Sequence, residues 1–573
     1  MNPTLPVLHL SAHLRSAVDH ALTAWDAAGN TLRLWARDST LWTGADESRW
    51  LGWLDVIGEQ LTDLSHLAEA AALGRSGEFD DVVVLGMGGS SLAPEVLAST
   101  FGAQPGFPRL SILDSTDPAQ ARALEQRLKL VRTLFVVASK SGSTLEPNVF
   151  HAYFWDRVQR ASGDAGSRFL AITDPGSPFS RVAAEAGFRR ILYGVPEIGG
   201  RFSALSNFGM VPAALMGLDV ADLLARADQM AKACGTAVPA ARNPGVLLGA
   251  VLGVAASRGI DKMTIVASPA LAALGAWLEQ LIAESTGKEG KAIIPVDREP
   301  LGPPDEYGAD RLFVYVRYAA APDAEQDGAV AALRAAGKPV VEVPAGDLRD
   351  LGQEFFRWEI ATAAAGHFLG VNPFNQPDVE ASKIATRQLT EAYESAGALP
   401  PGTPVFQQDG VELFTDEANA ADLRARLAED SLAGWLSAHV HRLMPGDYFG
   451  LLAYLEMNPR HEELLTRMRL AVRAARKTAT CAGFGPRFLH STGQAYKGGP
   501  NTGVFLQITC ADESDLPVPG RRLTFGVVKA AQAQGDFQVL AERRRRVLRA
   551  HLRGAVTDAL TRLAAAVETA AHP

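Results

Sequence analysis

Two stretches decide how this chain folds: Val82–Ser91, which reads VVVLGMGGSS, and Leu134–Thr144, which reads LFVVASKSGST. In each, an apolar run typical of a buried strand passes into a tight loop of small residues, and a helical pattern follows. Such a turn aims backbone N–H groups, hydroxyls and the positive end of a helix dipole at one small volume. The spacing matches neither the dinucleotide fingerprint nor the Walker loop, so the two loops predict a phosphate site of another kind.

The composition is that of an ordinary soluble protein of more than one domain. The chain has 573 residues, of which 47% are hydrophobic and 21% charged, and two or three domains are expected. The net charge of −9 argues against nucleic acid or a membrane as a partner, because both attract basic proteins. Cys234, Cys481 and Cys510 have no paired spacing, so neither a disulfide framework nor a zinc site is expected. No signal peptide or membrane-spanning stretch is visible, which predicts a cytoplasmic protein.

The order of apolar patterns predicts an α/β protein with two doubly wound parallel sheets. Residues 1–78 have helical spacing and are expected to form a helical N-terminal segment. In residues 79–225 and again in 226–385, short β-branched runs alternate with helical stretches, which is the pattern of βαβ units. We expect residues 386–573 to be a helical region that completes the second domain.

Individual runs refine this expectation. The predicted strands are Val82–Leu85, Leu110–Leu113, Leu134–Ala138, Phe169–Thr173, Arg190–Tyr193, Met263–Ala267, Leu312–Val316 and Val340–Val343. Within the C-terminal region, the apolar run Gly503–Thr509 favours one more buried strand. The tail from Ala541 to Leu563 is predicted to be an amphipathic helix with a basic, solvated face.

The first group of candidate site residues lies in the two glycine-rich loops. Hydroxyl donors and one cation stand beside flexible backbone there: Ser90, Ser139, Lys140, Ser141, Ser143 and Thr144. For one loop alone, helix N-capping is the better explanation of the serine and threonine residues. Because two such loops occur in successive βα units, a shared phosphate site is the better interpretation.

Two further segments carry residues suited to acid–base chemistry. Arg201, in GGRFSALS (199–206), is a candidate for stabilising an oxyanion, although a simple turn explains the glycines as well. Gln280 and Glu284 share one face of a helix that ends near Gly287. A carboxyl in the last helical turn meets the negative end of the dipole, which raises its pKa toward the range of a general base. The alternative for Glu284 is a solvated surface position.

Two more candidates come from loops rich in small and polar residues. Lys383 follows the loop GVNPFNQPDVEAS (370–382) and would lie two turns into a helix, where a lysine is usually solvent-facing. His490, in FLHSTGQ (488–494), has a side chain suited to proton transfer near neutral pH. A structural role is the alternative for any single histidine, and His367 is given that interpretation.

Together these motifs resemble the phosphoglucose isomerase family. The resemblance is carried by Gly-Arg-Phe-Ser (200–203), Glu-Ser-Thr-Gly-Lys (284–288) and Asn-Pro-Phe-Asn-Gln-Pro-Asp-Val-Glu (372–380). The run SKSGST (139–144) is similar to the phosphate loop of sugar-isomerase (SIS) domains, and the family's fold implies two SIS-type domains. The stretch WARDSTLWTG (35–44) is similar to the isomerase half of bacterial transaldolase–isomerase fusions.

The resemblance implies an aldose–ketose isomerase of glycolysis and gluconeogenesis. It would interconvert glucose 6-phosphate and fructose 6-phosphate through a cis-enediolate, without a metal or cofactor. The implied roles are phosphate binding for Ser139, Ser141 and Thr144, with Ser90, Lys140 and Ser143 nearby, proton transfer for Glu284, enediolate stabilisation for Arg201, ring opening for His490 and Lys383, and positioning of substrate hydroxyls for Gln280 and Gln376.

The order of the motifs departs from the family, and several questions stay open. The ring-opening histidine usually precedes the lysine segment, whereas His490 follows Lys383. In dimeric family members this histidine reaches into the neighbouring subunit, so both a homodimer and action within one chain are compatible with the sequence. A non-catalytic SIS sensor of sugar phosphates, or an isomerase of a sulfonated or aminated hexose, are the alternative functions. A sensor needs the phosphate loop but not Glu284, Arg201 and Lys383, and their presence favours the enzyme.

Overall fold

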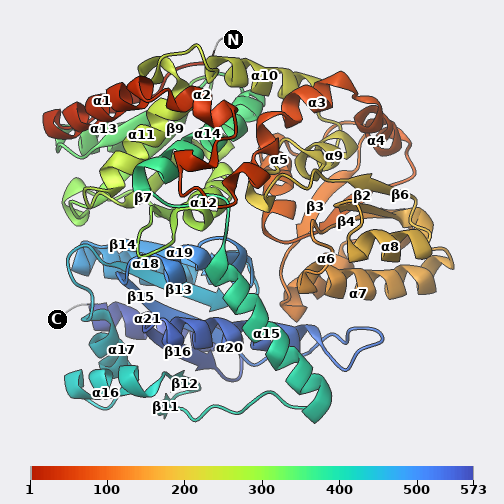
Figure 1. Ribbon diagram of the computed structural model, residues 1–573. Helices are drawn as coiled ribbons and strands as arrows, with labels where there is room; N and C mark the ends of the chain where they lie inside the picture. The colour runs from red at the N-terminus through yellow and green to blue at the C-terminus, as the bar shows by residue number, and fades with distance from the viewer. Residues whose placement is uncertain (1–2, 572–573) are drawn as a thin grey trace.

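The structure, a computed structural model, describes residues 3–571, and they form three α/β units, each with its own sheet (Figure 1). The α/β class with parallel sheets is therefore confirmed. Within these residues, no helix has the length and apolar character needed to cross a membrane, and no group of three or more His, Cys, Asp or Glu side chains could hold a metal ion.

The first unit has a five-stranded parallel sheet of order β3-β2-β4-β5-β6. Its strands are β2 (Asp81–Leu85), β3 (Arg109–Leu113), β4 (Thr133–Ala138), β5 (Phe169–Thr173) and β6 (Arg190–Tyr193), and its helices are α5 (Leu92–Phe101), α6 (Pro118–Gln126), α7 (Leu145–Ser162), α8 (Pro178–Glu185) and α9 (Asn207–Leu215). β2 and β4 are buried along their whole length, as expected of apolar runs covered on both faces. The strand order reverses between these two neighbours, so both glycine-rich loops open at the crevice where ligands bind in such sheets.

The second unit has a sheet of order β1-β10-β9-β7-β8. Its parallel strands are β7 (Lys262–Ala267), β8 (Ile294–Val296), β9 (Arg311–Tyr318) and β10 (Val340–Ala345), and its helices are α10 (Val220–Ala233), α11 (Pro244–Ala256), α12 (Leu274–Thr286), α13 (Ala324–Ala335) and α14 (Leu351–Leu369). α11 packs closely on α14 because Gly245, Gly249 and Gly253 recur every fourth residue, and a Cβ at Gly249 would meet the Ala361 carbonyl oxygen at 2.4 Å.

The N-terminal segment is helical, as predicted, with one exception. Its helices are α1 (Ala12–Ala27), α2 (Asn30–Trp35), α3 (Val56–Thr62) and α4 (Ser65–Arg75). The exception is β1 (Val7–His9), which pairs antiparallel with β10 at the edge of the second sheet. Trp25 of α1 packs against His367 and Phe368 of α14, so His367 belongs to the packing between these helices, as its structural interpretation predicts.

The C-terminal region corrects the sequence prediction. The sequence predicts a helical region that completes the second domain, but residues 406–571 form a six-stranded sheet of order β11-β12-β16-β15-β13-β14 with a core of its own. The strands are β11 (Phe406–Gln408), β12 (Val411–Phe414), β13 (Tyr448–Tyr454), β14 (Ala479–Phe484), β15 (Gly503–Cys510) and β16 (Arg546–Leu552), and the helices are α16 (Glu417–Arg426), α17 (Leu432–Val440), α18 (Pro459–Arg476), α19 (Gly493–Gly498), α20 (Phe525–Glu542) and α21 (Val556–Ala571). β15 confirms the predicted strand at Gly503–Thr509.

The predicted basic helix from Ala541 to Leu563 is wrong for a specific reason. Arg546–Leu552 forms β16, which pairs with β15 on one side and β12 on the other. Its Arg549 lies over the rings of Phe414 and Phe537, so a cation that the pattern assigns to a solvated face is covered by aromatic side chains.

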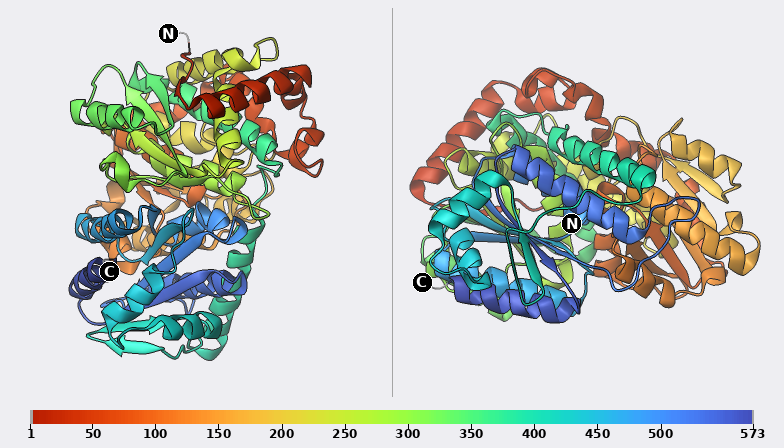
Figure 2. Two further views of the ribbon diagram at one scale, coloured as in Figure 1. Left: turned by 90° about the vertical axis from the view of Figure 1, so that its left-hand side faces the viewer. Right: turned by 90° about the horizontal axis from the view of Figure 1, so that it is seen from below.

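One long helix joins the second and third units. α15 (Pro377–Ala396) begins after the Asn-Pro-Phe-Asn-Gln loop and packs along α20; Figures 1 and 2 show the two helices side by side. This places the third unit against the first two.

Candidate active site

A cavity of about 630 Å³ lies where the three units meet. The loops after β2 and β4 supply one wall, α12 and α15 supply others, and the 3₁₀ helix Arg487–His490 of the third unit contributes Leu489 and His490. The structure brings these predicted residues to its lining: Ser90, Lys140, Ser141, Ser143, Thr144, Arg201, Gln280, Glu284, Gln376, Lys383 and His490. Of the predicted set, only Ser139 is not part of the lining.

The loop after β2 is glycine-rich because other backbone approaches it closely. Gly88 has a φ of +57°, and a Cβ there would lie 2.8 Å from Gln280 Nε2. A Cβ on Gly89 would overlap the Gly200 carbonyl, at 2.0 Å. Side chains at these positions would force the loop away from Arg201, whose segment it touches.

The loop after β4 presents hydroxyls at the start of a helix. Thr144 is the N-cap of α7, and the Ser141 and Ser143 hydroxyl oxygens lie 3.0 Å apart. α7 is 18 residues long, and its positive dipole end and these hydroxyls line the same cavity. This arrangement suits an anion with several oxygens, such as a phosphate.

Two residues of this loop are placed differently from the prediction. Ser139 is buried, its backbone N–H donates to the Ile172 carbonyl at 3.0 Å, and it does not reach the cavity because it still continues the sheet. Lys140 lines the cavity, but its ammonium donates to the Asp174 carboxylate and to the Val195 carbonyl. Lys140 thus holds the neighbouring loops together.

Glu284 and Arg201 form the second pole of the cavity. Glu284 stands in the last turn of α12, 7% exposed, and its Oε1 lies 3.4 Å from an Arg201 guanidinium nitrogen. The guanidinium also donates to Ser285 Oγ at 2.7 Å and to the Pro373 carbonyl at 2.7 Å, which fixes its plane. Burial lowers the pKa of Arg201, and the Glu284 carboxylate opposes that shift. A rigid cation beside a carboxylate can stabilise negative charge on a ligand oxygen while the carboxylate moves a proton.

His490 enters this cavity from its own chain. Its Nε2 lies 2.8 Å from Glu146 Oε1, and its backbone carbonyl accepts from Gln280 Nε2 at 2.7 Å. Burial by itself raises the pKa of Glu146, but the His490 cation and its hydrogen bond outweigh burial and lower the net pKa. The ionised Glu146 therefore holds a proton on Nε2, which leaves Nδ1 for exchange with a ligand.

Glu146 carries no usable signal in the sequence. It is the second residue of α7, where an acidic side chain is common because it faces the positive end of the dipole. Only the third unit, folded against the first, turns this ordinary position into the partner of His490.

α15 and its N-cap residue line the cavity from Gln376 through Lys383 and Arg387 to Glu391. Gln376 Oε1 accepts from Arg201 at 3.0 Å, and the Lys383 ammonium donates to Glu380 Oε1 at 2.8 Å. Arg387 lies one turn beyond Lys383 and was missed because the motif ends before it.

Comparisons with known proteins agree on one family. The phosphoglucose isomerase model matches residues 57–294. A protein of Rubrobacter xylanophilus (strain DSM 9941 / JCM 11954 / NBRC 16129 / PRD-1) named glucose-6-phosphate isomerase is 32% identical over 372 residues, which cover 56% of this chain and 84% of that protein. This chain belongs to the phosphoglucose isomerase family. A second relative, a glucose-6-phosphate isomerase of Thermosynechococcus vestitus (strain NIES-2133 / IAM M-273 / BP-1), is 31% identical over 376 residues, 57% of this chain and 70% of that protein.

Solved structures agree with the fold of this family member. The hypothetical protein TT0462 from Thermus thermophilus superposes with a TM-score of 0.57 and 26% identity, over 67% of this chain and 99% of that one. A glucose-6-phosphate isomerase from Chlamydia trachomatis D/UW-3/Cx has a TM-score of 0.52 at 23% identity, over 64% and 78% of the two chains. The matched family model ends at residue 294, before the third unit that carries His490.

The cations around the cavity differ in their pairing. Lys140, Arg201, Lys383 and Arg521 each contact a carboxylate. Arg387 has no carboxylate partner within residues 3–571 and lines the same cavity as the α7 loop. It is therefore the lining guanidinium that a ligand anion could engage without displacing a protein carboxylate.

Proposed function

We propose that this chain is a glucose-6-phosphate isomerase that interconverts glucose 6-phosphate and fructose 6-phosphate. The observation that carries the proposal is one cavity with two poles: the hydroxyl-lined start of α7, and Glu284 beside Arg201. A hexose 6-phosphate has a phosphate at one end and its reacting carbons at the other. The names of the relatives support the same activity.

In this mechanism the phosphate orients the reacting carbons. Ser141, Ser143 and Thr144 bind it at the positive end of α7, with Arg387 as an additional cation. Because the phosphate is remote from the reaction, its binding energy places C1 and C2 against Glu284.

Glu284 then moves one proton between C2 and C1. A carboxylate that removes the proton from C2 can return it to C1 from the same face, which passes through a cis-enediolate. Arg201 stabilises the oxyanion of that intermediate, so the proposed reaction uses no metal or cofactor. Gln280 and Gln376 are expected to position substrate hydroxyls.

Ring opening precedes this step and is assigned to His490 and Lys383. The Nδ1 atom of His490 is available for a proton, since Nε2 is bonded to Glu146. The reach of His490 into the cavity of its own chain supports its action within one chain. A homodimer stays a prediction, as does the likeness of residues 35–44 to the transaldolase–isomerase fusions.

A coupled assay tests the proposal. The purified chain is given fructose 6-phosphate in the presence of a chelator, and glucose 6-phosphate is detected through its dehydrogenase. We expect catalytic turnover that the chelator does not reduce. Binding of fructose 6-phosphate without turnover would instead identify a sensor, and turnover of a sulfonated or aminated hexose alone would identify another isomerase.

A further inference from the structure

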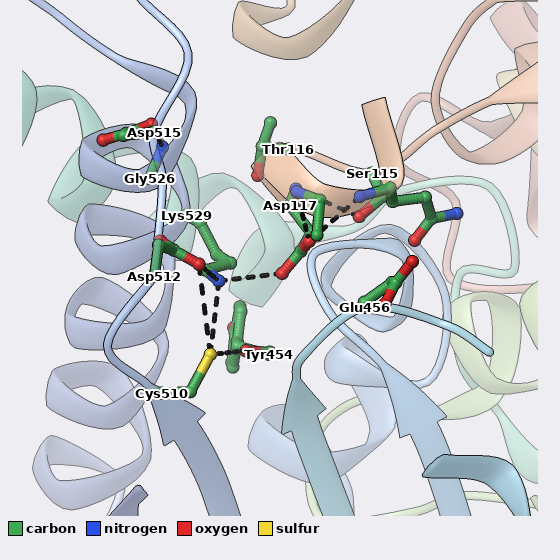
Figure 3. A network of polar contacts seen from close by, with 12 residues as sticks. Ser115, Thr116, Asp117, Tyr454, Glu456, Cys510, Asp512, Asp515, Gly526 and Lys529 are labelled. Atoms are coloured by element: carbon green, nitrogen blue, oxygen red, sulfur yellow. Dashed lines mark hydrogen bonds and ion pairs between the residues drawn. The ribbon is translucent and has the colours of Figure 1, made fainter. Parts of the chain in front are cut away.

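Helix α20 of the third unit docks on the loop that follows β3 in the first unit (Figure 3). The Lys529 ammonium donates to Asp117 Oδ2 at 2.8 Å and also contacts Asp512, and both Lys529 and Asp117 are 2% exposed. Cys510 Sγ lies 3.5 Å from the same ammonium. A buried, hydrogen-bonded ion pair of this kind fixes the position of α20 against the first unit.

One turn further along α20, Gln532 makes a second contact between the same elements. Its Nε2 donates to Glu146 Oε1 at 2.6 Å, and its Oε1 accepts from the Thr116 hydroxyl at 2.7 Å. Gln532 is 2% exposed and Thr116 is fully buried. A carboxylate only accepts, so the amide nitrogen must face Glu146 and the amide cannot turn over.

Gln532 and His490 donate to the same oxygen of Glu146. Thr116, Gln532, Glu146 and His490 thus form one hydrogen-bonded chain from the first unit, through α20, to the cavity. We propose that Gln532 is a positioning residue for His490 in the isomerase reaction: it fixes the Glu146 carboxylate and thereby the orientation of the imidazole. This inference rests on the proposed function.

The physical effect of Gln532 follows from the burial of Glu146. A buried carboxylate needs hydrogen bonds to stay ionised, and Gln532 supplies one that carries no charge. The charged or titratable groups that act on Glu146 are His490 from the third unit and Lys383 from α15, and Tyr454 of β13 lies close enough to be affected by its charge. Without the hydrogen bond from the Gln532 amide, the Glu146 carboxylate would depend more on His490 for its stabilisation. The protonated, positively charged form of the His490 imidazole would therefore be favoured.

The test compares Gln532→Met with Gln538→Met. Methionine keeps nearly the length and volume of glutamine without its hydrogen bonds, and Gln538 is an exposed residue of the same helix that bonds only Glu542. Three quantities are measured against pH: kcat for fructose 6-phosphate, KM for fructose 6-phosphate, and the titration of the His490 ring signal in histidine-labelled protein, assigned with His490→Asn.

For Gln532→Met we expect kcat to fall about 10-fold at a KM within about 2-fold of the wild-type value, because the variant disturbs proton transfer and not phosphate binding. The midpoint of the His490 titration should rise by about one pH unit, with the same shift in the pH dependence of kcat. Gln538→Met should change none of these quantities.

An unchanged His490 midpoint in Gln532→Met would overturn the inference, as would a loss of kcat with an unchanged pH profile. Thr116→Val removes the bond that orients the amide and should shift the midpoint in the same direction by a smaller amount, so it provides the test if Gln532→Met does not fold. If the wild-type chain lacks isomerase activity, the proposed function fails, whereas the ring titration still decides the role of Gln532.

Discussion

At the scale of single residues, the sequence predicted site residues where a motif lies directly next to a clear strand or helix pattern. Ser141, Ser143, Thr144, Arg201 and Glu284 follow strands or end helices whose apolar patterns are plain, and they line one cavity. Ser139 belongs to the same motif but is buried in the sheet. Successive side chains of a strand point to opposite faces, so a difference of one position at the end of a strand decides which face a side chain lies on.

The difference between Ser139 and Thr144 leads to a first prediction. Thr144→Ala should raise KM for fructose 6-phosphate about 10-fold with little change in kcat, because the hydroxyl at the start of α7 is expected to contact the phosphate. Ser139→Ala should leave KM within about 2-fold of the wild-type value. Steady-state kinetics of both variants decide the matter, and the reverse ranking would return Ser139 to the phosphate site.

At the scale of elements, most strands of the first two units were predictable because each apolar run is β-branched and followed by a helical pattern, whereas the three-residue strands β1 and β8 were not predicted. In the third unit β15 was predicted, but β13 and β14 were not, and the arginines of β16 imitate a basic helix. Side-chain pairing of strands that are distant in sequence decides such cases, and a single sequence does not contain it.

Close packing of α11 on α14 gives a prediction at this scale. Alanine favours a helix over glycine by about 1 kcal/mol, yet Gly249→Ala should lower the free energy of unfolding by about 1–3 kcal/mol, because its Cβ has no room beside Ala361. Gly58→Ala, within α3 and facing open space, is the matched control and should stabilise the protein by about 0.5–1 kcal/mol. Chemical denaturation measures both; equal stabilisation by the two variants would contradict the close packing.

At the scale of the whole molecule, the third unit completes the cavity by bringing His490 to Glu146. Neither residue shows this from its local sequence, because the contact joins α7 to a 3₁₀ helix 344 positions later in the chain. His490 follows Lys383 in this chain, unlike the order usual in the family, and the structure shows that His490 lies in a separate α/β unit.

Because of the Glu146–His490 contact, the free energy of unfolding should depend on pH in the acidic range. The folded pKa of Glu146 lies below its ordinary value of 4.5, so its contribution is complete above about pH 4.5 and is lost as pH falls through the folded pKa. Glu146→Gln should thus lower the free energy of unfolding by about 1–3 kcal/mol near neutral pH. The loss should shrink as the pH falls below about 4.5 and through the lowered folded pKa. Denaturation of both proteins across this range checks the sign, and a loss that grows in acid would contradict it.

Hydrogen exchange with solvent tests the central claim, proton transfer by Glu284, most directly. Fructose 6-phosphate is incubated with the protein and a chelator in deuterium oxide, and deuterium at C2 of the glucose 6-phosphate formed is measured by mass spectrometry. We predict deuterium at C2 for the wild-type chain and, for Glu284→Gln, a rate of turnover and incorporation lower by about 10³-fold or more with binding retained. Near-normal turnover by Glu284→Gln, with or without deuterium at C2, would contradict the account.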